Sequence, residues 1–514
     1  MKQKLFIEII FLAFLGTLTS LSLTPFNLFI INFFTFPFFY LFLNNKLKQN
    51  KNTKLFFLYG WSFGFGYFVT NLYWISISLT FDQSFKFLIP FSLILIPSFL
   101  ALFYGLVSHF FLVLHQKSII TSFFIFSLIF GVIEFLRGLI LTGFPWNLIV
   151  YSLSKQLEFL SITSIIGTYG LNLFCISLFT SPAIMFLGKT KKNIAVCIFL
   201  LITSIFFYAY GFFQKDSFYR VDNKSIDYKI RIIGSNITLD RFYTNINTVS
   251  IIQDLIKLSS PSSSEKTIFI WPEGILPDIS QEELKKYSLL FDQNFSQNHL
   301  FVIGTNNKVI NNSSVNYFNS LSVYDNELNI LDYYNKINLV PFGEFLPIEN
   351  VLKVFGLKSI TNNYQSFSKG KTRKVIEIEL QNSTIKVLPL ICYEIIYSGK
   401  LFNNSSFDFI INISEDGWFG KSIGPKQHFE HSIFRAIESG KYIVRSSNNG
   451  IAAIINPIGV VEQSVDFGNS GYVDLIEMRK IQPTIFSKYG NKIFGLLILL
   501  YILLIFSFNK IKNE

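Results

Sequence analysis

The stretch Val387-Leu388-Pro389-Leu390-Ile391-Cys392-Tyr393-Glu394 places a cysteine directly after an apolar run. The run predicts a buried strand, and a helix is expected to begin near Tyr393. At such an elbow the thiol is expected to be exposed, the following amides can hold an oxyanion, and the helix end lowers a thiol pKa. Cys392 is therefore either a reactive thiol or an inert buried one, and its position favours reactivity.

The region around this stretch, residues 214–490, reads as ordinary soluble sequence in which strand-like and helical patterns alternate. Several of the strand-like runs are continuously apolar, as expected when both faces of a sheet are covered. The pattern predicts an α/β layered sandwich. The strand-like runs are 229–237, 267–271, 299–305, 383–391, 407–413, 441–447 and 451–463, and the helical patterns are 281–296, 394–402 and 427–440.

The sequence on either side of this region is far more apolar. Half of the 514 residues are hydrophobic and 15% are charged, against about 25% charged in soluble proteins. A membrane-crossing helix needs roughly 20 mainly apolar residues, and about eight candidates occur, at 5–22, 26–44, 55–79, 87–114, 119–141, 157–187, 193–213 and 493–509. The expected organisation is a membrane domain with seven helices (1–213), a soluble domain (214–490) and a closing helix with a tail (491–514). The first segment is expected to be an uncleaved helix rather than a signal peptide.

The lysines in the loops predict the direction in which these helices cross the membrane. If the loops alternate between two sides, one side holds twelve lysines, whereas the short loops of the other hold only Lys86 and Lys155. Positive loops stay in the cytoplasm, so both termini are expected there and 214–490 faces outward. The net charge of +11 does not indicate nucleic-acid binding, because the soluble part lacks a basic stripe with interleaved aromatics. The twelve are Lys2, Lys4, Lys46, Lys48, Lys51, Lys54, Lys117, Lys189, Lys191, Lys192, Lys510 and Lys512.

A few residues inside the expected spans are polar or small. Glu134 and Arg137 share a helix face, so they form either a functional site or an internal ion pair. Three glycines, at 60, 64 and 66, indicate close helix packing rather than a phosphate loop. The other two cysteines, Cys175 and Cys197, lie in expected spans and need no special explanation.

Two further segments carry charged residues in apolar surroundings. Glu273 ends the strand-like run of Ile-Trp-Pro-Glu-Gly, and Lys336 and Glu344 lie in the apolar, turn-like stretch 334–347. Alone, each has an ordinary interpretation: a surface carboxylate, a solvated lysine and a turn cap. Together with Cys392 they give a Glu, a Lys and a Cys in that chain order.

That order and its flanks resemble the carbon–nitrogen hydrolase (nitrilase) superfamily, which uses a Glu-Lys-Cys triad in an αββα sandwich. With the multi-span membrane region, nearly the whole chain resembles the apolipoprotein N-acyltransferase family of Gram-negative bacteria. Two departures are Tyr243 near a usual Trp and Glu415 in place of a usual Asn. Further matching segments are Gly66-Tyr67-Phe68 through Tyr73-Trp74-Ile75, Glu134-Phe135-Leu136-Arg137-Gly138, Gly143-Phe144-Pro145-Trp146, Asp416-Gly417-Trp418-Phe419-Gly420, and Arg445 through Asn448-Asn449-Gly450.

The resemblance implies a ping-pong acyl transfer through a thioester on Cys392, with Glu273 as base and Lys336 as oxyanion stabiliser. The donor would be phosphatidylethanolamine or phosphatidylglycerol, and the acceptor the α-amino group of an S-diacylglyceryl-cysteine on apolipoproteins. The enzyme is expected to be a monomer in the bacterial inner membrane, with its catalytic domain in the periplasm and without metal or other cofactor. The residues expected to bind substrate or support the triad are Glu344, Tyr393, Glu394, Trp418, Arg435 and Trp146.

Several alternatives stay open at this point. His428 and His431 suggest a metal, but without an evident third ligand they are better explained as ordinary helix residues. Arg435 and Arg445 are consistent either with binding of a phosphate or carboxylate ligand or with structural ion pairs. Trp146 is consistent either with lining a lipid entrance or with anchoring the protein at the membrane interface. The alternative functions are a membrane-tethered amidase or nitrilase that transfers the acyl group to water, and a transporter or sensor with a degenerate nitrilase domain.

Overall fold

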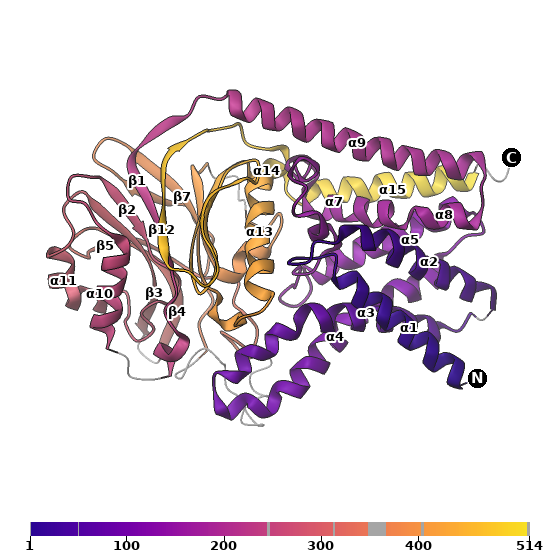
Figure 1. The fold of residues 1–514 in the computed structure, drawn as a ribbon, viewed down its shortest axis with the longest axis horizontal. Helices are drawn as coiled ribbons and strands as arrows, with labels where there is room; N and C mark the ends of the chain where they lie inside the picture. The colour runs from indigo at the N-terminus through magenta and orange to yellow at the C-terminus, as the bar shows by residue number, and fades with distance from the viewer. Residues whose placement is uncertain are drawn as a thin grey trace.

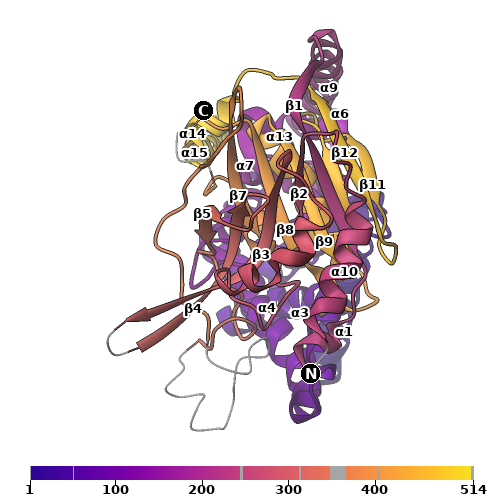
Figure 2. The ribbon, with the colours of Figure 1, turned by 90° about the vertical axis from the view of Figure 1, so that its left-hand side faces the viewer.

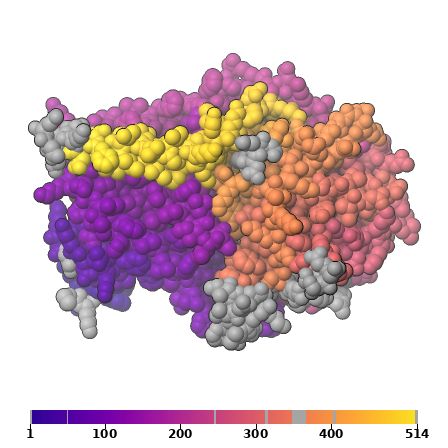
Figure 3. All heavy atoms as spheres, turned by 180° about the vertical axis from the view of Figure 1, so that it is seen from behind, coloured from indigo at the N-terminus to yellow at the C-terminus, as the bar shows by residue number. Residues whose placement is uncertain are grey.

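The protein consists of a helical part and a sheet part that lie end to end along its long axis (Figure 1). The computed structural model describes residues 2–49, 51–243, 247–311, 314–347, 366–401 and 406–510. The helical part takes its helices from both ends of the chain, because α15 (Lys492–Lys510) packs against α5 (Ile119–Arg137) and α7 (Thr163–Thr180). Figure 3 shows α15, in yellow, running along the N-terminal helices.

Long helices joined by short ones make up the rest of the helical part. The long helices are α1 (Lys2–Ser20), α2 (Asn32–Gln49), α3 (Thr53–Leu72), α4 (Ile89–Leu114) and α9 (Lys191–Arg220). The short ones are η1 (Phe29–Ile31), η2 (Tyr73–Thr80), η3 (Gln83–Leu88), η4 (Ile149–Leu153), α6 (Leu157–Leu160) and α8 (Pro182–Leu187).

Among the described residues, six helices are long and apolar enough to cross a membrane: Gln3–Ser20, Gln83–Leu114, Ile119–Arg137, Thr163–Leu187, Lys191–Arg220 and Lys492–Asn509. The other two expected spans, 26–44 and 55–79, are helical in α2 and α3 but are not among these six. Much of α3 is buried, and a helix enclosed by other helices can carry Gly, Ser, Thr and Tyr instead of the aliphatic surface that lipid requires.

Small residues let these helices approach closely. A Cβ atom on Gly66 of α3 would lie 1.9 Å from the carbonyl oxygen of Ala13 in α1, and one on Gly60 would lie 2.1 Å from the carbonyl oxygen of Tyr104 in α4. The glycines therefore serve helix packing, as their spacing indicated.

The ion pair in α5 also has a structural explanation. Arg137 Nη2 lies 2.6 Å from Glu134 Oε2, and both side chains are fully buried. Arg137 also donates to the carbonyl oxygens of Phe144 and Asn147. Of the two interpretations, this geometry supports the internal pair, which fixes the loop after α5.

Within the described residues, the strands form a twelve-stranded sheet, which makes up the other part of the protein (Figure 2). Its order is β5-β4-β3-β2-β1-β9-β8-β7-β6, while β12 pairs with β1, and β10 pairs with β9 and β11. The strands are β1 (Lys224–Ser235), β2 (Thr267–Ile270), β3 (His299–Asn311), β4 (Ser314–Tyr324), β5 (Ile330–Asn335), β6 (Ile376–Glu379), β7 (Thr384–Ile391), β8 (Phe409–Glu415), β9 (Tyr442–Asn448), β10 (Ala452–Ile455), β11 (Val461–Val465) and β12 (Gly471–Met478).

Helices cover the sheet on both sides (Figure 1). On the side away from the helical part, α10 (Thr248–Ser259) and α11 (Ser288–Asp292) pack on β1, β2 and β3. On the other side, α13 (Gly424–Ser439) lies between the sheet and α7. Every residue of β2, β8 and β9 is buried, as expected for strands of a sheet that is covered on both faces.

Some elements differ from the predicted ones. The helix expected at 281–296 is a short 3₁₀ helix, η6 (Glu283–Tyr287), followed by α11, and the helix expected at 394–402 is the 3₁₀ helix η8 (Cys392–Ile396). Four strands (β4, β5, β6 and β12) and α10 had no counterpart among the predicted elements. The remaining elements are η5 (Leu239–Phe242), η9 (Asp416–Phe419) and α14 (Ile485–Tyr489).

The helical part and the sheet part meet through α13. The indole of Trp146, in the loop after α5, donates to Gln427 Oε1 over 2.9 Å, and Ser154 Oγ donates to Glu430 Oε1 over 2.6 Å. Near the far end of α13, the amide of Thr168 donates to Glu438 Oε1 over 2.7 Å. Because all of these groups are buried, they join the two parts along the whole of the helix.

Candidate active site

Cys392 lies at the point where β7 ends and η8 begins. Its backbone φ is +47°, a left-handed conformation that non-glycine residues adopt only where the surrounding structure imposes it. The predicted elbow is therefore present. The expected exposure of the thiol is wrong, because Cys392 is only 8% exposed and packs in the core.

The electrostatics of the thiol also differ from the expectation. Burial, and then the charge of Glu273, raises the pKa of the Cys392 thiol well above its usual value, while Lys336 opposes the shift. A five-residue 3₁₀ helix has little dipole to offset burial. The resting thiol is therefore protonated near neutral pH, and it needs a base.

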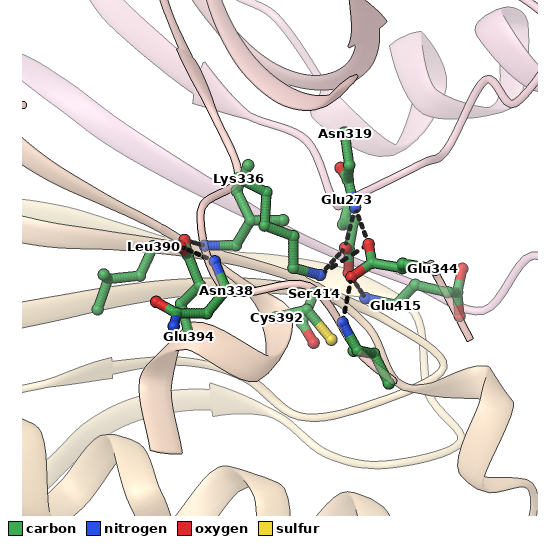
Figure 4. A network of polar contacts seen from close by, with 12 residues as sticks. Glu273, Asn319, Lys336, Asn338, Glu344, Leu390, Cys392, Glu394, Ser414 and Glu415 are labelled. Carbon is green, nitrogen blue, oxygen red and sulfur yellow. Dashed lines mark hydrogen bonds and ion pairs between the residues drawn. The ribbon is translucent and has the colours of Figure 1, made fainter. Parts of the chain in front are cut away.

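Glu273, Lys336 and Glu344 meet beside Cys392 (Figure 4). Lys336 Nζ lies 3.0 Å from Glu273 Oε1 and 3.0 Å from Glu344 Oε1. Although burial alone would lower it, the two carboxylates raise the pKa of Lys336, which is 1% exposed. The lysine is therefore a fixed cation in a buried site.

Asn319 of β4 holds the two carboxylates at this spacing. Its side-chain amide donates to Glu273 Oε1 and to Glu344 Oε1, over 2.7 Å in each case. The second oxygen of Glu273 accepts the backbone N–H of Glu415 over 2.9 Å, and that of Glu344 accepts the N–H of Val340 over 2.8 Å. Both carboxylates are thus oriented by several donors before any substrate arrives.

The sheet topology brings these distant residues together. Glu273 follows β2, Lys336 follows β5 and Cys392 follows β7. Successive pairings show that these three strands run in the same direction, so their carboxyl ends lie at one edge of the sheet. Ligand and catalytic sites gather at such edges.

Glu394 fastens the lysine segment to the cysteine segment. Its Oε1 accepts from the hydroxyl of Tyr334 over 2.8 Å and from the backbone N–H of Ile337 over 3.0 Å, and its Oε2 accepts from the N–H of Ile391 over 2.9 Å. Arg373 Nη2 adds an ion pair at 3.0 Å. These contacts hold the two segments together in the buried site.

Tyr393 and Trp146 link the segment around Cys392 to the helical part. The Tyr393 hydroxyl donates to the carbonyl of Gly143 over 3.0 Å. Trp146 is 2% exposed and packs between Trp74 and the ring of His428, with centroids 4.9 and 5.3 Å away. Its position argues against the membrane-interface anchor, because that role requires an exposed indole.

The other two expected supporting residues lie in different surroundings. Trp418 is half-buried against Phe242 and Phe81, at centroid distances of 5.1 and 6.0 Å. Arg435 is fully buried, pairs with Glu438 at 2.9 Å and donates to Thr168 Oγ1 over 2.6 Å. The contacts of Arg435 support structural pairing between the two parts rather than a phosphate site.

A second polar cluster, formed by Asp416, His428 and Arg445, adjoins Cys392. Asp416 Oδ1 lies 2.8 Å from His428 Nδ1 and accepts from Ser414 Oγ, while Asp416 Oδ2 accepts from Arg445 Nη2 over 2.8 Å. Burial would raise the pKa of Asp416, but Arg445 and His428 hold it below its usual value. His428 is therefore not the ordinary helix residue that its spacing favoured.

This cluster contains residue types that also bind metals. Candidate ligand atoms of Cys392, Asp416 and His428 lie within 4.8 Å of one another. Both oxygens of Asp416 and Nδ1 of His428 are already engaged by protein groups, and Arg445 supplies the countercharge. The donor set therefore functions here as an ion-pair network.

Glu415, which stands where the family usually has Asn, is bonded to other residues of the protein. Glu415 forms a buried ion pair with Arg241 Nη2, accepts from Asn448 Nδ2 over 2.7 Å and accepts the N–H of Gly417 over 2.8 Å. These bonds fix the backbone whose N–H donates to Glu273. Tyr243, the other departure, lies near Trp418.

Sequence reasoning missed Asn319 and the roles of Asp416 and His428. Asn319 lies on a strand with no predicted counterpart, and one available signal was the alternation of polar and apolar residues in Ser-Leu-Ser-Val at 320–323. For His428, the signal was Asp416 directly after an apolar strand, but no local pattern joins it to a helix twelve residues away.

The raised pKa of the thiol predicts a steep pH dependence of alkylation. Below its pKa the thiolate fraction rises about tenfold per pH unit, so the alkylation rate of Cys392 by iodoacetamide should rise about tenfold per unit between pH 7 and 9, without a plateau. Mass spectrometry of tryptic peptides from the detergent-solubilised full chain measures this rate, with Cys392→Ala as the blank. A plateau below pH 8 would contradict a protonated resting thiol.

An α/β sandwich with a Glu-Lys-Cys constellation at one strand edge, joined to apolar helices, defines a membrane-bound enzyme of the carbon–nitrogen hydrolase class. The sequence model described as carbon-nitrogen hydrolase matches residues 265–474, and the one described as apolipoprotein N-acyltransferase N-terminal domain matches residues 15–181. An apolipoprotein N-acyltransferase from Rhodopseudomonas palustris is 31% identical, with 95% of this chain and 93% of the relative covered. Another, from Rickettsia prowazekii, is 32% identical, with 97% and 98% covered. This chain belongs to the apolipoprotein N-acyltransferase family.

Proposed function

We propose that this enzyme transfers a fatty acyl group from a membrane phospholipid, through a thioester on Cys392, to the α-amino group of an S-diacylglyceryl-cysteine on apolipoproteins. The proposal rests on its family membership and on one observation above all. A buried carboxylate and a buried ammonium stand beside a strained cysteine. The turn that bears this cysteine is bonded to the loop after α5 in the helical part.

In the first half-reaction, Glu273 takes the proton from the Cys392 thiol as sulfur attacks the ester carbonyl of the phospholipid. The carbonyl oxygen becomes an oxyanion that Lys336 and the amide of Tyr393 stabilise. When the intermediate collapses, the carbon–oxygen bond breaks and Glu273 returns the proton to the leaving alkoxide. The products are an acyl thioester and a lysophospholipid.

In the second half-reaction, the amine of the acceptor attacks the thioester carbonyl. Glu273 removes a proton from the attacking nitrogen, and the same donors stabilise the second oxyanion. The carbon–sulfur bond then breaks, and the thiolate recovers its proton from Glu273. An amide bond has formed and the enzyme is regenerated.

We also propose that the sheet part faces the periplasm and that both termini are cytoplasmic. The first described residues of α1 and the last of α15 lie at the end of the helical part away from the sheet (Figure 1). This arrangement agrees with the loop lysines, which favour the cytoplasm for the same end. A periplasmic site next to the helices would receive both lipid substrates from the outer leaflet of the inner membrane.

The proposal predicts a covalent intermediate on Cys392. After incubation of the full chain in detergent with phosphatidylethanolamine of a single acyl composition, intact mass spectrometry should show an addition of one acyl group, absent from Cys392→Ala. Subsequent addition of a diacylglyceryl-cysteine peptide should discharge the adduct into an acylated peptide. Equal labelling of Cys392→Ala, or discharge only as free fatty acid, would contradict the transfer reaction; the second result would indicate a hydrolase.

A further inference from the structure

The imidazole of His428 lies against the peptide group that follows the nucleophile. Its Nε2 is 3.3 Å from the carbonyl oxygen of Cys392, and the side chain is fully buried. A carbonyl oxygen only accepts, so a hydrogen bond at this contact requires a proton on Nε2. The ring belongs to α13, whereas Cys392 follows β7, so the contact joins two separate elements.

Other groups fix the orientation of this ring. On its Nδ1 side stand Asp416 Oδ1 at 2.8 Å and Arg445 Nη2 at 3.1 Å. With one ring proton, on Nε2, Nδ1 can accept from Arg445; with two, Nδ1–H can donate to Asp416. The bond from Nε2 to the Cys392 carbonyl is present in both of these states, and it is absent when the single ring proton lies on Nδ1.

Aromatic rings hold the faces of the imidazole. Trp146 stacks on it at 5.3 Å and 21°, and Phe419 meets it edge-on at 5.5 Å. Trp146 is itself fixed by its bond to Gln427, the residue before His428. The helical part thus contributes directly to the position of the ring.

The peptide between Cys392 and Tyr393 connects this contact to the chemistry. Because a peptide group is planar and trans, its C=O and N–H point in opposite directions, so a bond that holds the carbonyl of Cys392 also aims the N–H of Tyr393. That N–H belongs to the first turn of η8, where amides have no acceptor within the helix. A donor on the carbonyl also polarises the N–H and strengthens it as a donor.

We propose that His428 is a positioning residue for the oxyanion, which it serves by holding the Cys392 carbonyl and thereby aiming the Tyr393 amide. The inference rests on the proposed acyl transfer. It assigns a role to His428, which acts through the peptide group between Cys392 and Tyr393. The Glu273–Lys336 pair would serve proton transfer and charge, whereas His428 would set the direction of the backbone donor.

Two isosteric substitutions separate the ring nitrogens. The amide nitrogen of glutamine reaches the position of Nε2, whereas that of asparagine reaches only the position of Nδ1. His428→Gln should form the thioester from phosphatidylethanolamine within about fivefold of the wild-type rate, and His428→Asn about thirtyfold more slowly, less than the full loss of an oxyanion donor. Quenched-flow mass spectrometry of the full chain measures both rates.

Alkylation of Cys392 by iodoacetamide supplies the readout that distinguishes positioning from a structural role. Displacement at a saturated carbon forms no oxyanion, so both variants should be alkylated within about twofold of the wild-type rate while their acylation rates diverge. His431→Gln is the matched control. His431 lies one turn along α13 and packs on Trp146 and Tyr151, and its variant should keep the wild-type acylation rate.

Each other pattern of rates overturns the inference. If the acylation and alkylation rates fall together in either variant, His428 maintains the local structure or the reactivity of the Cys392 thiol. If His428→Asn retains acylation, or both variants do, the bond from Nε2 is unimportant. Failure of the wild-type chain to form a thioester would instead overturn the proposed function, so the two failures are distinguishable.

Discussion

Replacing Glu273 by glutamine should lower the rate of acyl-enzyme formation by about a thousandfold, within the range known for general bases. The variant keeps the shape of the side chain but cannot accept the thiol proton, and burial holds that proton on Cys392. The glutamine also meets donors on both sides. Lys336 and Asn319 donate to one oxygen of Glu273, and the N–H of Glu415 donates to the other. Wherever the glutamine places its NH₂ group, that group therefore faces a hydrogen-bond donor instead of an acceptor.

Single-turnover thioester formation, followed by mass spectrometry, measures this loss. Raising the pH from 7 to 9 should recover part of it, since hydroxide then generates the thiolate that the missing base no longer provides. The exposed Glu282 offers a matched control, because Glu282→Gln makes the same change of charge outside the site. A Glu273→Gln variant that acylates at the wild-type rate would exclude this carboxylate as the base.

Replacing Lys336 by methionine should cost both rate and stability. Loss of the ammonium that stabilises the oxyanion should slow thioester formation by about a hundredfold or more. Glu273 and Glu344 would also share a buried site without their common partner, and breaking a buried ion pair by removing one side typically costs about 3–5 kcal/mol. Thermal unfolding in detergent should therefore show a clear decrease in Tm, whereas Lys257→Met, at an exposed position of α10, should show none.

A double variant separates the two effects. Lys336→Met combined with Glu344→Gln removes one of the two uncompensated carboxylates, so part of the lost stability should return. The acylation rate should stay low, because the cation beside the reacting carbonyl is still missing. Recovery of the rate together with the stability would mean that Lys336 only holds the site together.

Local patterns in the sequence determined much of the fold and the principal site. The apolar run before Cys392 and the apolar helices follow from composition and periodicity, which depend on neighbouring residues. The Glu-Lys-Cys triad was predicted instead from a resemblance, because the order and flanks of its three segments resemble the carbon–nitrogen hydrolase superfamily. The glycines of α3 are a similar case, because a small residue in an apolar helix indicates close packing before its partner helix is known.

Tertiary structure alone decided how the thiol is buried and which residues surround it. Asn319 lies 46 residues from Glu273 and 25 from Glu344, and His428 lies 36 residues from the carbonyl that it contacts. Such contacts arise from strand order and from the packing of α13 against the helical part, which no local pattern specifies. The pKa of the thiol follows the same logic, because it depends on the burial and charges that distant segments supply once the chain has folded.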